Sequence, residues 1–405
     1  MREIYDLNGR LERITKTVQN SAKVSRRNKE LIFKFKDDMF AEGLSTARVL
    51  FYLNRLWNIA RWVDKDFNEM TEEDLKELVR KIGQMDYKEL TKLDHRKVIK
   101  KFYKWLDGDD RKVKWIKSWM NNGKEKLPEE LLNKEDIQNL IKACYNVRDK
   151  AIISVLWESG CRIGELLGMK IKNVQFDEKG AVVIVFGKTG SRRIRLVSSV
   201  PHLSNWLEHH PHKDDSEAPL WVSIGSKNHA NQVMYHCMNT RLRKIAKRAG
   251  IKKKVNPHIF RHSRATDLAN LLTEAQMKQY FGWTKDSKMA ATYVHLSGRD
   301  IDEAILKIHG KLDENEKLAH EQLKTQMCPI CRHENAPEAD YCLRCRRPLN
   351  LRTLLETEEK EKELLRLMTP EMIEQMIQKR VDEILTKYMA QVQTQPEPLK
   401  IKVMV

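Results

Sequence analysis

The chain has 405 residues, a formal net charge of +18 and a pI near 9.4. This length is enough for two or three domains with buried cores, and the excess of lysine and arginine favours a polyanionic partner, most simply nucleic acid. The first residues do not have the pattern of a secretory signal peptide, and no apolar run is long enough to span a bilayer. We therefore exclude an integral membrane protein and expect a cytoplasmic one.

The first part of the chain predicts a helical domain that follows an arm. Residues 1–24 are polar and mixed, and we expect a short helix or a loose arm there. Four stretches with helical apolar spacing then follow over residues 25–110. Thr71, for example, is an N-cap followed by three acidic residues. Taken alone, this pattern fits any small helical bundle.

A basic and poorly patterned segment at residues 111–127 predicts a linker between two domains. Gly123 lies inside it and Pro128 follows it, and both residues disfavour continuous helix or strand. Because the net charge favours a nucleic-acid partner, a hinge here would let two domains close around a duplex. We therefore expect basic side chains around position 116 to lie near DNA phosphates.

The next 185 residues or so, 128–312, predict a second domain of helices with a small antiparallel sheet. Asn133 caps one helix, and residues 148–158 form a second helix whose apolar residues predict burial. Residues 174–197 predict three antiparallel strands joined by two turns. The expected fold class is therefore mainly α with a small antiparallel sheet (α+β).

The residues with the clearest chemistry lie between Asn256 and Leu296. His258 and Arg261 are three residues apart, so they share one face of a helix, and Pro257 suits its first turn. An arginine fork matches phosphate oxygens, a histidine transfers protons near neutral pH, and a tyrosine needs activation to become a nucleophile. Together they suit attack on a phosphodiester. A serine or cysteine hydrolase would not need the arginine, and a metal nuclease would need carboxylates.

Five motifs in this order resemble the catalytic boxes of the tyrosine recombinase family (phage integrase, Xer-like). They are Ser159-Gly160-Cys161-Arg162 with its following helix, Phe186-Gly187-Lys188-Thr189-Gly190, His258-x-x-Arg261-His262, Gly282-Trp283, and Tyr293. Any one of these motifs alone would be weak evidence. The resemblance covers residues 25 to 310, and it implies that the N-terminal helices are a SAM-like core-binding domain and that residues 128–312 are the catalytic domain.

The resemblance also assigns the central roles in a reaction on DNA. Arg162 and Arg261 would hold the non-bridging oxygens of the scissile phosphate, and Glu165 would fix the rotamer of Arg162. Tyr293 would attack in line and give a 3′-phosphotyrosyl enzyme with a free 5′-hydroxyl. The covalent bond keeps the energy of the phosphodiester, so a second DNA end reverses the step. Catalysis would need no metal or other cofactor.

Supporting roles follow from the same boxes. Lys188, at the tip of the predicted hairpin, would protonate the leaving oxygen, although a lysine in a glycine-rich turn is usually just solvated. His258 would assist proton transfer. Trp283 would bind and pack, because an indole donates one hydrogen bond but moves no proton. His262 is expected to give structural support from a different face, and Tyr280 is the nearest rival to the predicted nucleophile.

Further basic residues are expected to contact DNA phosphates. They belong to the predicted hairpin and to a segment without acidic residues that precedes the His258 box: Arg192, Arg193, Lys252, Lys253 and Lys254. A histidine-rich patch at residues 202–212 could bind a metal, but a loop and helix end fits it better, and we assign it no catalytic role.

Four of the seven cysteines form two Cys-x-x-Cys pairs: Cys328, Cys331, Cys342 and Cys345. In a cytoplasmic chain this spacing predicts a zinc site and not disulfides. We expect a zinc ribbon over residues 325–349 whose Cys₄ site is closed and therefore structural. Contact of this ribbon with DNA and contact with protein are equally open. The style of the ribbon resembles archaeal-type integrases.

Two helices and a tail are expected after the ribbon. Residues 350–390 predict a charged helix and then a helix that starts at Thr369-Pro370 with an apolar face. That face either associates with a second copy of the chain or folds back on the catalytic domain. Residues 391–405 are expected to be a disordered tail.

The sequence thus predicts a site-specific DNA recombinase that acts on double-stranded DNA and assembles there as a tetramer, with structural Zn²⁺. Integration, excision and dimer resolution remain equally open. Two alternatives are a type IB-like topoisomerase, which uses the same chemistry, and a non-catalytic zinc-ribbon DNA-binding protein with a decayed recombinase core. The helical N-terminal domain and the five intact boxes favour the recombinase.

Overall fold

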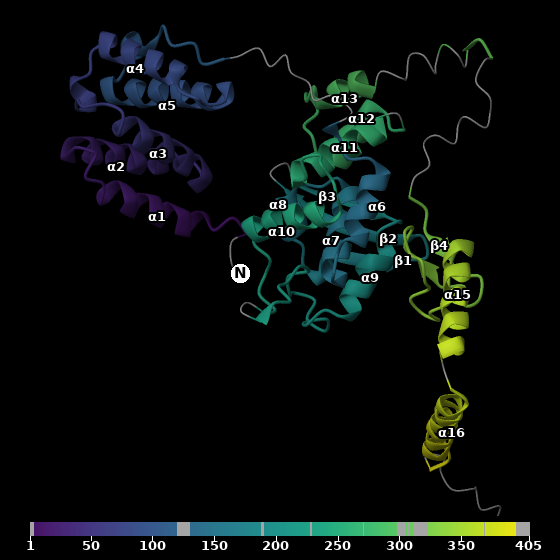
Figure 1. Cartoon of the computed structure of the whole chain (residues 1–405). Helices are drawn as coiled ribbons and strands as arrows, with labels where there is room; N and C mark the ends of the chain where they lie inside the picture. Colours follow the sequence, from purple (N-terminus) through teal and green to yellow (C-terminus); the bar gives the residue numbers. More distant parts are fainter. Residues whose placement is uncertain are drawn as a thin grey trace, which may run out of the picture. The chain divides into compact units, whose positions relative to one another are not determined.

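The structure is a computed structural model that describes residues 4–119, 130–187, 190–226, 229–269, 271–297, 305, 308–310, 323–367 and 369–393 (Figure 1). The chain divides into two compact units, residues 1–320 and 321–405. In the described ranges, no helix is both long enough and apolar enough to cross a membrane.

The first unit begins with helices that share one hydrophobic core. They are α1 (Leu7–Gln19), α2 (Arg26–Ala41), α3 (Thr46–Ala60), α4 (Glu72–Gln84) and α5 (Glu89–Asp107), with a 3₁₀ turn at Phe67–Glu69. Thr71 caps α4 in a reciprocal hydrogen-bond pair with Asp74, as its sequence predicted. The difference from expectation lies at the start of the chain. Ile14 and Val18 of α1 are buried in this core, so residues 7–19 are part of the helical bundle and not an arm.

The predicted linker also starts later than the sequence suggested. Val113, in the 3₁₀ turn Arg111–Val113, is fully buried in the N-terminal core. Position 116 is an isoleucine with 2 % of its surface exposed. The expectation of a DNA-contacting basic residue at position 116 is therefore wrong, and the exposed lysines there are Lys114 and Lys117. Residues 120–129 lie outside the described residues.

The second group of helices in this unit surrounds a single buried helix, α7 (Val147–Ser159). The other helices are α6 (Lys134–Lys142), α8 (Ile163–Leu167), α9 (Val200–Glu208), α10 (Tyr235–Arg248), α11 (Pro257–Ala269), α12 (Glu274–Phe281) and α13 (Met289–Ser297). Helix α7 packs against α6, α9 and α11, which explains why its apolar residues do not follow one stripe. The fold class predicted from the sequence is confirmed.

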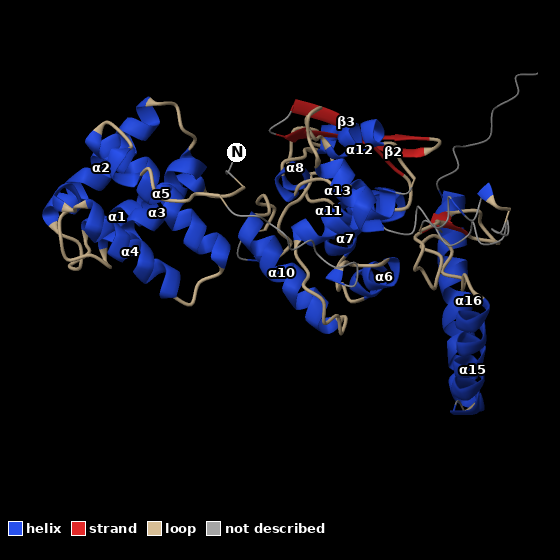
Figure 2. Cartoon of the chain, turned by 90° about the horizontal axis from the view of Figure 1, so that it is seen from above, coloured by secondary structure: helices blue, strands red, loops and turns tan. Residues whose placement is uncertain are grey.

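A three-stranded antiparallel sheet flanks these helices (Figure 2). Its strands are β1 (Val174–Asp177), β2 (Gly180–Gly187) and β3 (Gly190–Leu196), after a 3₁₀ turn at Ile171–Asn173. In β3, Ile194 and Leu196 are buried and Arg193 and Arg195 are exposed. Because side chains alternate along a strand, Arg192 is placed on the inward face with Ile194 and Leu196.

The second unit holds a small ribbon and two helices. The ribbon pairs β4 (Gln326–Met327) with β5 (Glu334–Asn335), and α15 (Leu351–Leu367) and α16 (Pro370–Gln393) follow. The hydroxyls of Tyr341 and Thr357 form a hydrogen bond between the ribbon and α15. Of the expected tail, residues 391–393 belong to α16 and 394–405 lie outside the described residues. Near the end of the predicted catalytic domain, residues 298–304 and 306–307 also lie outside the described residues.

Candidate active site

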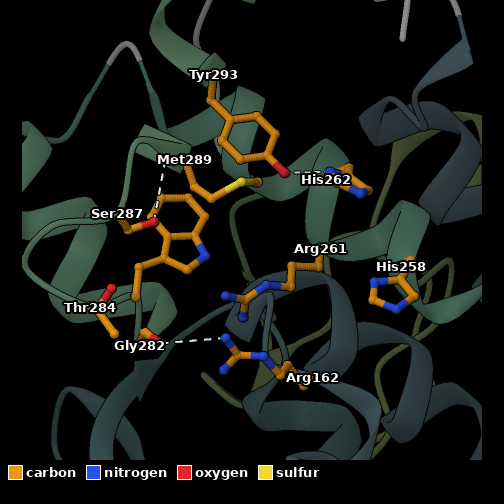
Figure 3. A pocket seen from close by; sticks show the side chains of 10 residues that line it. Arg162, His258, Arg261, His262, Gly282, Thr284, Ser287, Met289 and Tyr293 are labelled. Carbon is orange, nitrogen blue, oxygen red and sulfur yellow. Dashed lines mark hydrogen bonds between the residues drawn. The ribbon is translucent and has the colours of Figure 1, made fainter. Parts of the chain in front are cut away.

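A pocket of about 410 Å³ brings together residues from α8, α11, α13 and the turn after α12 (Figure 3). It is lined by Arg162, His258, Arg261, His262, Gly282, Trp283, Thr284, Ser287, Met289 and Tyr293. Five of the six predicted catalytic residues line this pocket. The sixth, Lys188, lies outside the described residues.

Arg162 reaches the pocket because the buried helix α7 stops sharply just before it. Gly160 ends α7 with φ of 53°, a left-handed conformation that favours glycine. A Cβ at this glycine would also lie 2.5 Å from the ring of Phe281, so no larger residue fits without a shift. Arg162 is then the N-cap of α8, and its guanidinium donates to Glu165 Oε1 at 2.8 Å. Its side chain stays 37 % exposed toward the pocket.

Glu165 is the centre of a buried charge network behind Arg162. Arg192 donates to Glu165 Oε2 at 2.7 Å and to the carbonyl oxygen of Tyr280 at 2.8 Å. Burial by itself would raise the pKa of Glu165. The hydrogen bonds from the two arginines have the larger combined effect, so the pKa of Glu165 lies below its usual value. The carboxylate is therefore charged at neutral pH and tethers both guanidinium groups.

This network places Arg192 differently from the sequence expectation. Its side chain is only 9 % exposed and is engaged by Glu165 and Tyr280, whereas its neighbour Arg193 is exposed. The position is suited to fixing Glu165 and, through it, Arg162. A Cβ at Gly282 would lie 2.8 Å from Nη1 of Arg192, so this glycine also makes room for the network.

Arg261 is the more deeply buried of the two pocket arginines, with 7 % of its surface exposed. Its guanidinium donates to the carbonyl oxygens of Gly160 at 3.0 Å and Phe281 at 2.6 Å. Burial, and then the nearby charge of Arg162, lower its pKa to about 10. The group is still charged at neutral pH, and an anion bound in the pocket would offset both unfavourable effects.

The hydroxyl of Tyr293 points toward His262 in the pocket (Figure 3), and the other side of the tyrosine packs on aromatic rings. The ring of Trp283 is stacked on it at 5.6 Å with an interplanar angle of 6°, and Phe281 stacks on Trp283 at 5.0 Å. The Tyr293 hydroxyl forms a hydrogen bond with Nδ1 of His262. Only 4 % of the residue is exposed, and burial raises its pKa to about 12.

His262 was expected to give structural support from a different face than His258, and the structure shows that the expected face is wrong. His258 and His262 are four residues apart on α11 with ring centroids separated by 6.3 Å, and both line the pocket. The spacing of four contains this information, because such residues share a helix face. His258 is exposed, whereas His262 contacts the tyrosine hydroxyl.

The rival tyrosines occupy other positions. The Tyr280 hydroxyl donates to the carbonyl oxygen of Glu158 at 2.6 Å. The ring of Tyr235 packs on Tyr5 at 5.3 Å. Tyr5, which no sequence motif indicated, lies beside Gly164 of α8, where an added Cβ would be 2.5 Å from its hydroxyl. Of these four tyrosines, the described pocket contains Tyr293.

Of the residues expected to contact DNA in this part of the chain, some are exposed and others form hydrogen bonds inside the protein. Arg193, Lys252 and Lys254 are exposed. Lys253 instead donates to Asp136 at 2.7 Å and to the carbonyl oxygen of Leu131 at 2.9 Å, and so connects the segment before α11 to α6.

The four paired cysteines come together in the second unit. The sulfur atoms of Cys328, Cys331, Cys342 and Cys345 all lie within 4.8 Å of one another, and the group could hold a metal ion. The backbone N–H of Arg332 bonds to the Cys328 carbonyl, and that of Arg346 bonds to the Cys342 carbonyl. Both arginines have left-handed backbones, with φ of 57° and 62°. The two cysteine turns therefore repeat one local geometry.

Comparison with known proteins agrees with the geometry of the pocket. The phage integrase family matches residues 130–299, which include both pocket arginines and Tyr293. Residues 130–299 of this chain form a phage integrase family domain, and the relatives that match the chain are tyrosine recombinases. The activity class of the chain is that of a tyrosine-type site-specific DNA recombinase. The matched segment ends before the cysteine cluster, so the family match does not extend to the second unit.

Relatives of this recombinase come from archaea and bacteria. Tyrosine recombinase XerA of Saccharolobus solfataricus is 24 % identical over 289 residues, which are 69 % of this chain and 92 % of the relative. Tyrosine recombinase XerD of Vibrio vulnificus is 23 % identical and covers 73 % of this chain and 98 % of its own.

Solved structures share the fold of this recombinase. The XerH site-specific recombinase bound to palindromic difH substrate has a TM-score of 0.52 and 17 % identity, and it covers 76 % of this chain and 98 % of its own. The Tn1549 transposon integrase in complex with transposon right end DNA has a TM-score of 0.52 and 15 % identity, and it covers 69 % of this chain and 98 % of its own.

Proposed function

We propose that this pocket cleaves and rejoins DNA strands through a 3′-phosphotyrosyl intermediate on Tyr293. The observation that supports the proposal best is that two guanidinium groups, two imidazoles and one tyrosine hydroxyl line a single pocket of about 410 Å³. Arginine forks match the oxygens of a phosphate, and the tyrosine supplies the nucleophile.

Each side chain has a part in the proposed reaction. Arg162 and Arg261 hold the non-bridging oxygens of the scissile phosphate and stabilise the charge that develops in the transition state. Tyr293 attacks phosphorus, and the 5′-oxygen leaves. Lys188, placed by the family resemblance, protonates that oxygen, and His258 assists proton transfer.

The hydrogen bonds that hold the two guanidinium groups in place should favour the strand-cleavage step. Gly160 and Phe281 hold the Arg261 guanidinium through their carbonyl oxygens, and Glu165 holds that of Arg162. Both cations are thus positioned before any substrate binds, so little reorganisation is needed when the transition state forms. Trp283 completes the wall by holding the tyrosine ring flat against its own.

Double-stranded DNA is the proposed partner. The net charge of +18 supports it, and Arg193, Lys252 and Lys254 are exposed basic residues of the catalytic part. We assign Arg192 and Lys253 to internal support instead, because Glu165 and Asp136 engage them. Because the proposed substrate is DNA, we expect the protein to act in the cytoplasm.

A tetramer on DNA is the assembly that we propose for the complete reaction. Exchange between two duplexes breaks four strands, and each covalent intermediate occupies one tyrosine. Each chain offers one such pocket in its described part. Four chains therefore supply one nucleophile for each strand, and closed symmetry is the common arrangement of such assemblies.

We propose that the cysteine cluster holds a structural Zn²⁺. The sulfur atoms of Cys328 and Cys345 are 3.5 Å apart and those of Cys331 and Cys342 are 3.6 Å apart. A tetrahedral zinc with Zn–S bonds of about 2.3 Å requires S···S separations of roughly 3.8 Å, so the group fits the ion. Asn335 Nδ2 lies 3.7 Å from the Cys342 sulfur as an outer hydrogen-bond donor. Metal analysis of the purified protein should give one zinc per chain, and a value near zero would contradict the proposal.

The proposed activity is tested by trapping the covalent adduct. Labelled duplexes that tile the DNA around the protein's own coding sequence carry a nick near each candidate site, so that the short product diffuses away. The wild-type protein should give a slow-migrating adduct on a denaturing gel, with and without EDTA. Tyr293→Phe should give none, whereas Tyr280→Phe, the matched control, should still give it.

Two results would contradict the proposal. One is tight DNA binding with no adduct on any duplex, which would favour a binding protein. The other is an adduct that persists in Tyr293→Phe. Joining of the trapped strand to a second duplex then separates a recombinase from an enzyme that only relaxes DNA.

A further inference from the structure

We propose that His262 is a catalytic residue that accepts the proton of the Tyr293 hydroxyl as this oxygen attacks the phosphate. The inference rests on the proposed phosphotyrosyl chemistry and adds a specific proton acceptor to it. This general base is not His258, which the family resemblance predicted to assist proton transfer.

The geometry that carries this inference is the contact between the two side chains. The Tyr293 hydroxyl and Nδ1 of His262 form a hydrogen bond, and the ring centroids are 5.8 Å apart with an interplanar angle of 45° (Figure 3). A general base must lie within hydrogen-bond reach of the proton that it takes. When the proton of the neutral imidazole is on Nε2, Nδ1 accepts the hydrogen bond that the phenol donates.

The tyrosine is fixed in this orientation by more than the histidine. Trp283 stacks on one face of its ring at 5.6 Å, and the residue is 4 % exposed. His262 follows Arg261 directly on α11, and the guanidinium of Arg261 is held by two carbonyl oxygens. One short segment of helix thus presents a phosphate-binding cation and, beside it, the partner of the nucleophile.

The environment of Tyr293 creates a need for a base. Burial raises the pKa of its hydroxyl to about 12, and the charge of Arg261 reduces this rise only in part. At neutral pH only roughly one hydroxyl in 10⁵ would be ionised with such a pKa. Water has little access to a residue that is 4 % exposed, so an internal acceptor is the direct route for the proton.

The proposed step balances in atoms and charge. The bond from the Tyr293 oxygen to phosphorus forms while the bond from phosphorus to the 5′-oxygen breaks. The phenol proton passes to Nδ1 of His262, and the 5′-oxygen takes a proton from Lys188. During rejoining, the 5′-hydroxyl attacks phosphorus and returns its proton to Lys188, and the released Tyr293 oxygen recovers its proton from His262, as microscopic reversibility requires.

The test uses a substitution that keeps the hydrogen bond and removes the base. In His262→Asn, the side-chain oxygen occupies a position near that of Nδ1 and accepts a hydrogen bond, but it does not take up a proton at neutral pH. Single-turnover cleavage is measured with full-length protein on a duplex that the wild type cleaves. We expect the rate to fall about 10²-fold or more, the usual contribution of general base catalysis, while DNA affinity stays within about threefold.

A modified substrate identifies which proton is concerned. When sulfur replaces the bridging 5′-oxygen, the leaving group no longer needs an acid. Lys188→Met should then recover its lost rate, whereas His262→Asn should remain slow on the same duplex. Recovery of His262→Asn on the sulfur substrate would place this histidine at the leaving group and overturn the proposal.

Further outcomes of the His262 substitutions also decide the proposal. An oxygen-substrate rate for His262→Asn within about threefold of the wild type would mean that a hydrogen bond is sufficient and would also overturn the proposal. If His262→Asn unfolds below the assay temperature, His262→Ala with added imidazole replaces it. Recovery of cleavage by imidazole supports the proposal, and no recovery in folded protein contradicts it. Absence of an adduct in the wild type is a different result, because it contradicts the phosphotyrosyl reaction itself.

Discussion

The catalytic pocket and the cysteine cluster are built in opposite ways. The pocket combines Arg162, Arg261 and Tyr293, which are separated by up to 131 positions (293 − 162). The cluster takes its four sulfur ligands from 18 consecutive positions, 328 to 345 (345 − 328 + 1). The pocket therefore depends on the packing of a whole domain, whereas the cluster depends on two short turns and an ion.

This difference determines what supports each site. Carbonyl oxygens at the ends of α7 and α12, and the buried Glu165, hold the pocket cations. The ribbon has two strands of two residues each, which is too little to form a core of its own. We expect packing defects to damage the pocket and metal loss to damage the ribbon, and each of the following predictions tests one side of that contrast.

Removal of zinc should have the largest effect. Binding of a structural Zn²⁺ contributes about 10–16 kcal/mol in small zinc domains, so Cys342→Ser should unfold residues 326–349. Hydrogen exchange should show protection lost in the ribbon and retained in α7. The matched control is Cys237→Ser, which changes an exposed cysteine outside the cluster. One zinc per chain and a protected ribbon in Cys342→Ser would contradict the prediction.

Loss of a pocket arginine should have the next largest effect, and it is measured on activity. Arg162→Ala should slow single-turnover cleavage by about 10²–10³-fold, as loss of one preorganised donor to a transition state does. Arg195→Ala, on an exposed arginine paired with Asp177, should change the rate by less than about threefold. The account is contradicted if the two variants cleave equally fast.

Replacement of Arg192 tests the support behind the pocket. Arg192→Ala removes two hydrogen bonds and leaves Glu165, whose side chain is 3 % exposed, with one cation fewer. The free energy of unfolding should fall by roughly 2–3 kcal/mol. Arg193→Ala should stay within about 0.5 kcal/mol, because that side chain is exposed. Denaturant titration measures the unfolding free energy of both variants. Equal losses of stability would show that the buried network around Glu165 does not stabilise the protein.

Substitution of two glycines should have the smallest effects on stability. Comparing the two substitutions separates the cost of backbone strain from the cost of steric crowding. Gly250 and Gly282 both have positive φ, 68° and 60°, but an added Cβ meets nothing within 4 Å at Gly250 and lies 2.8 Å from Arg192 at Gly282. Gly250→Ala should cost about 1 kcal/mol of unfolding free energy, and Gly282→Ala about 1 kcal/mol more. A Gly282→Ala protein as stable as Gly250→Ala would show that Arg192 moves aside freely.

Much of the fold was accessible from the sequence because its local patterns are strong. The cap at Thr71, the buried helix α7 and the three strands over residues 174–197 lie where the sequence predicted them. The places that differ are those decided by tertiary contacts. Ile14 and Ile116 are ordinary apolar residues near a predicted boundary, and only the assembled core shows that they are buried in it.

Two site residues were assigned the wrong surroundings although the pattern contained the answer. Arg192 shares the inward face of β3 with Ile194 and Leu196 at a spacing of two, which opposes a direct role at the surface. His262 lies four residues after His258 and therefore shares its helix face. The contact with Tyr293, which is 31 positions away, could not be predicted, because it depends on how α13 packs on α11.

The measurement that tests the central claim most directly is identification of the residue joined to DNA. The trapped adduct is digested with nuclease and trypsin, and the modified peptide is sequenced by mass spectrometry. The account predicts a nucleotide remnant on Tyr293 in the peptide of residues 289–299, joined through a phosphate ester to a 3′-oxygen. A remnant on Tyr280, on a serine, or on a 5′-oxygen would contradict the account.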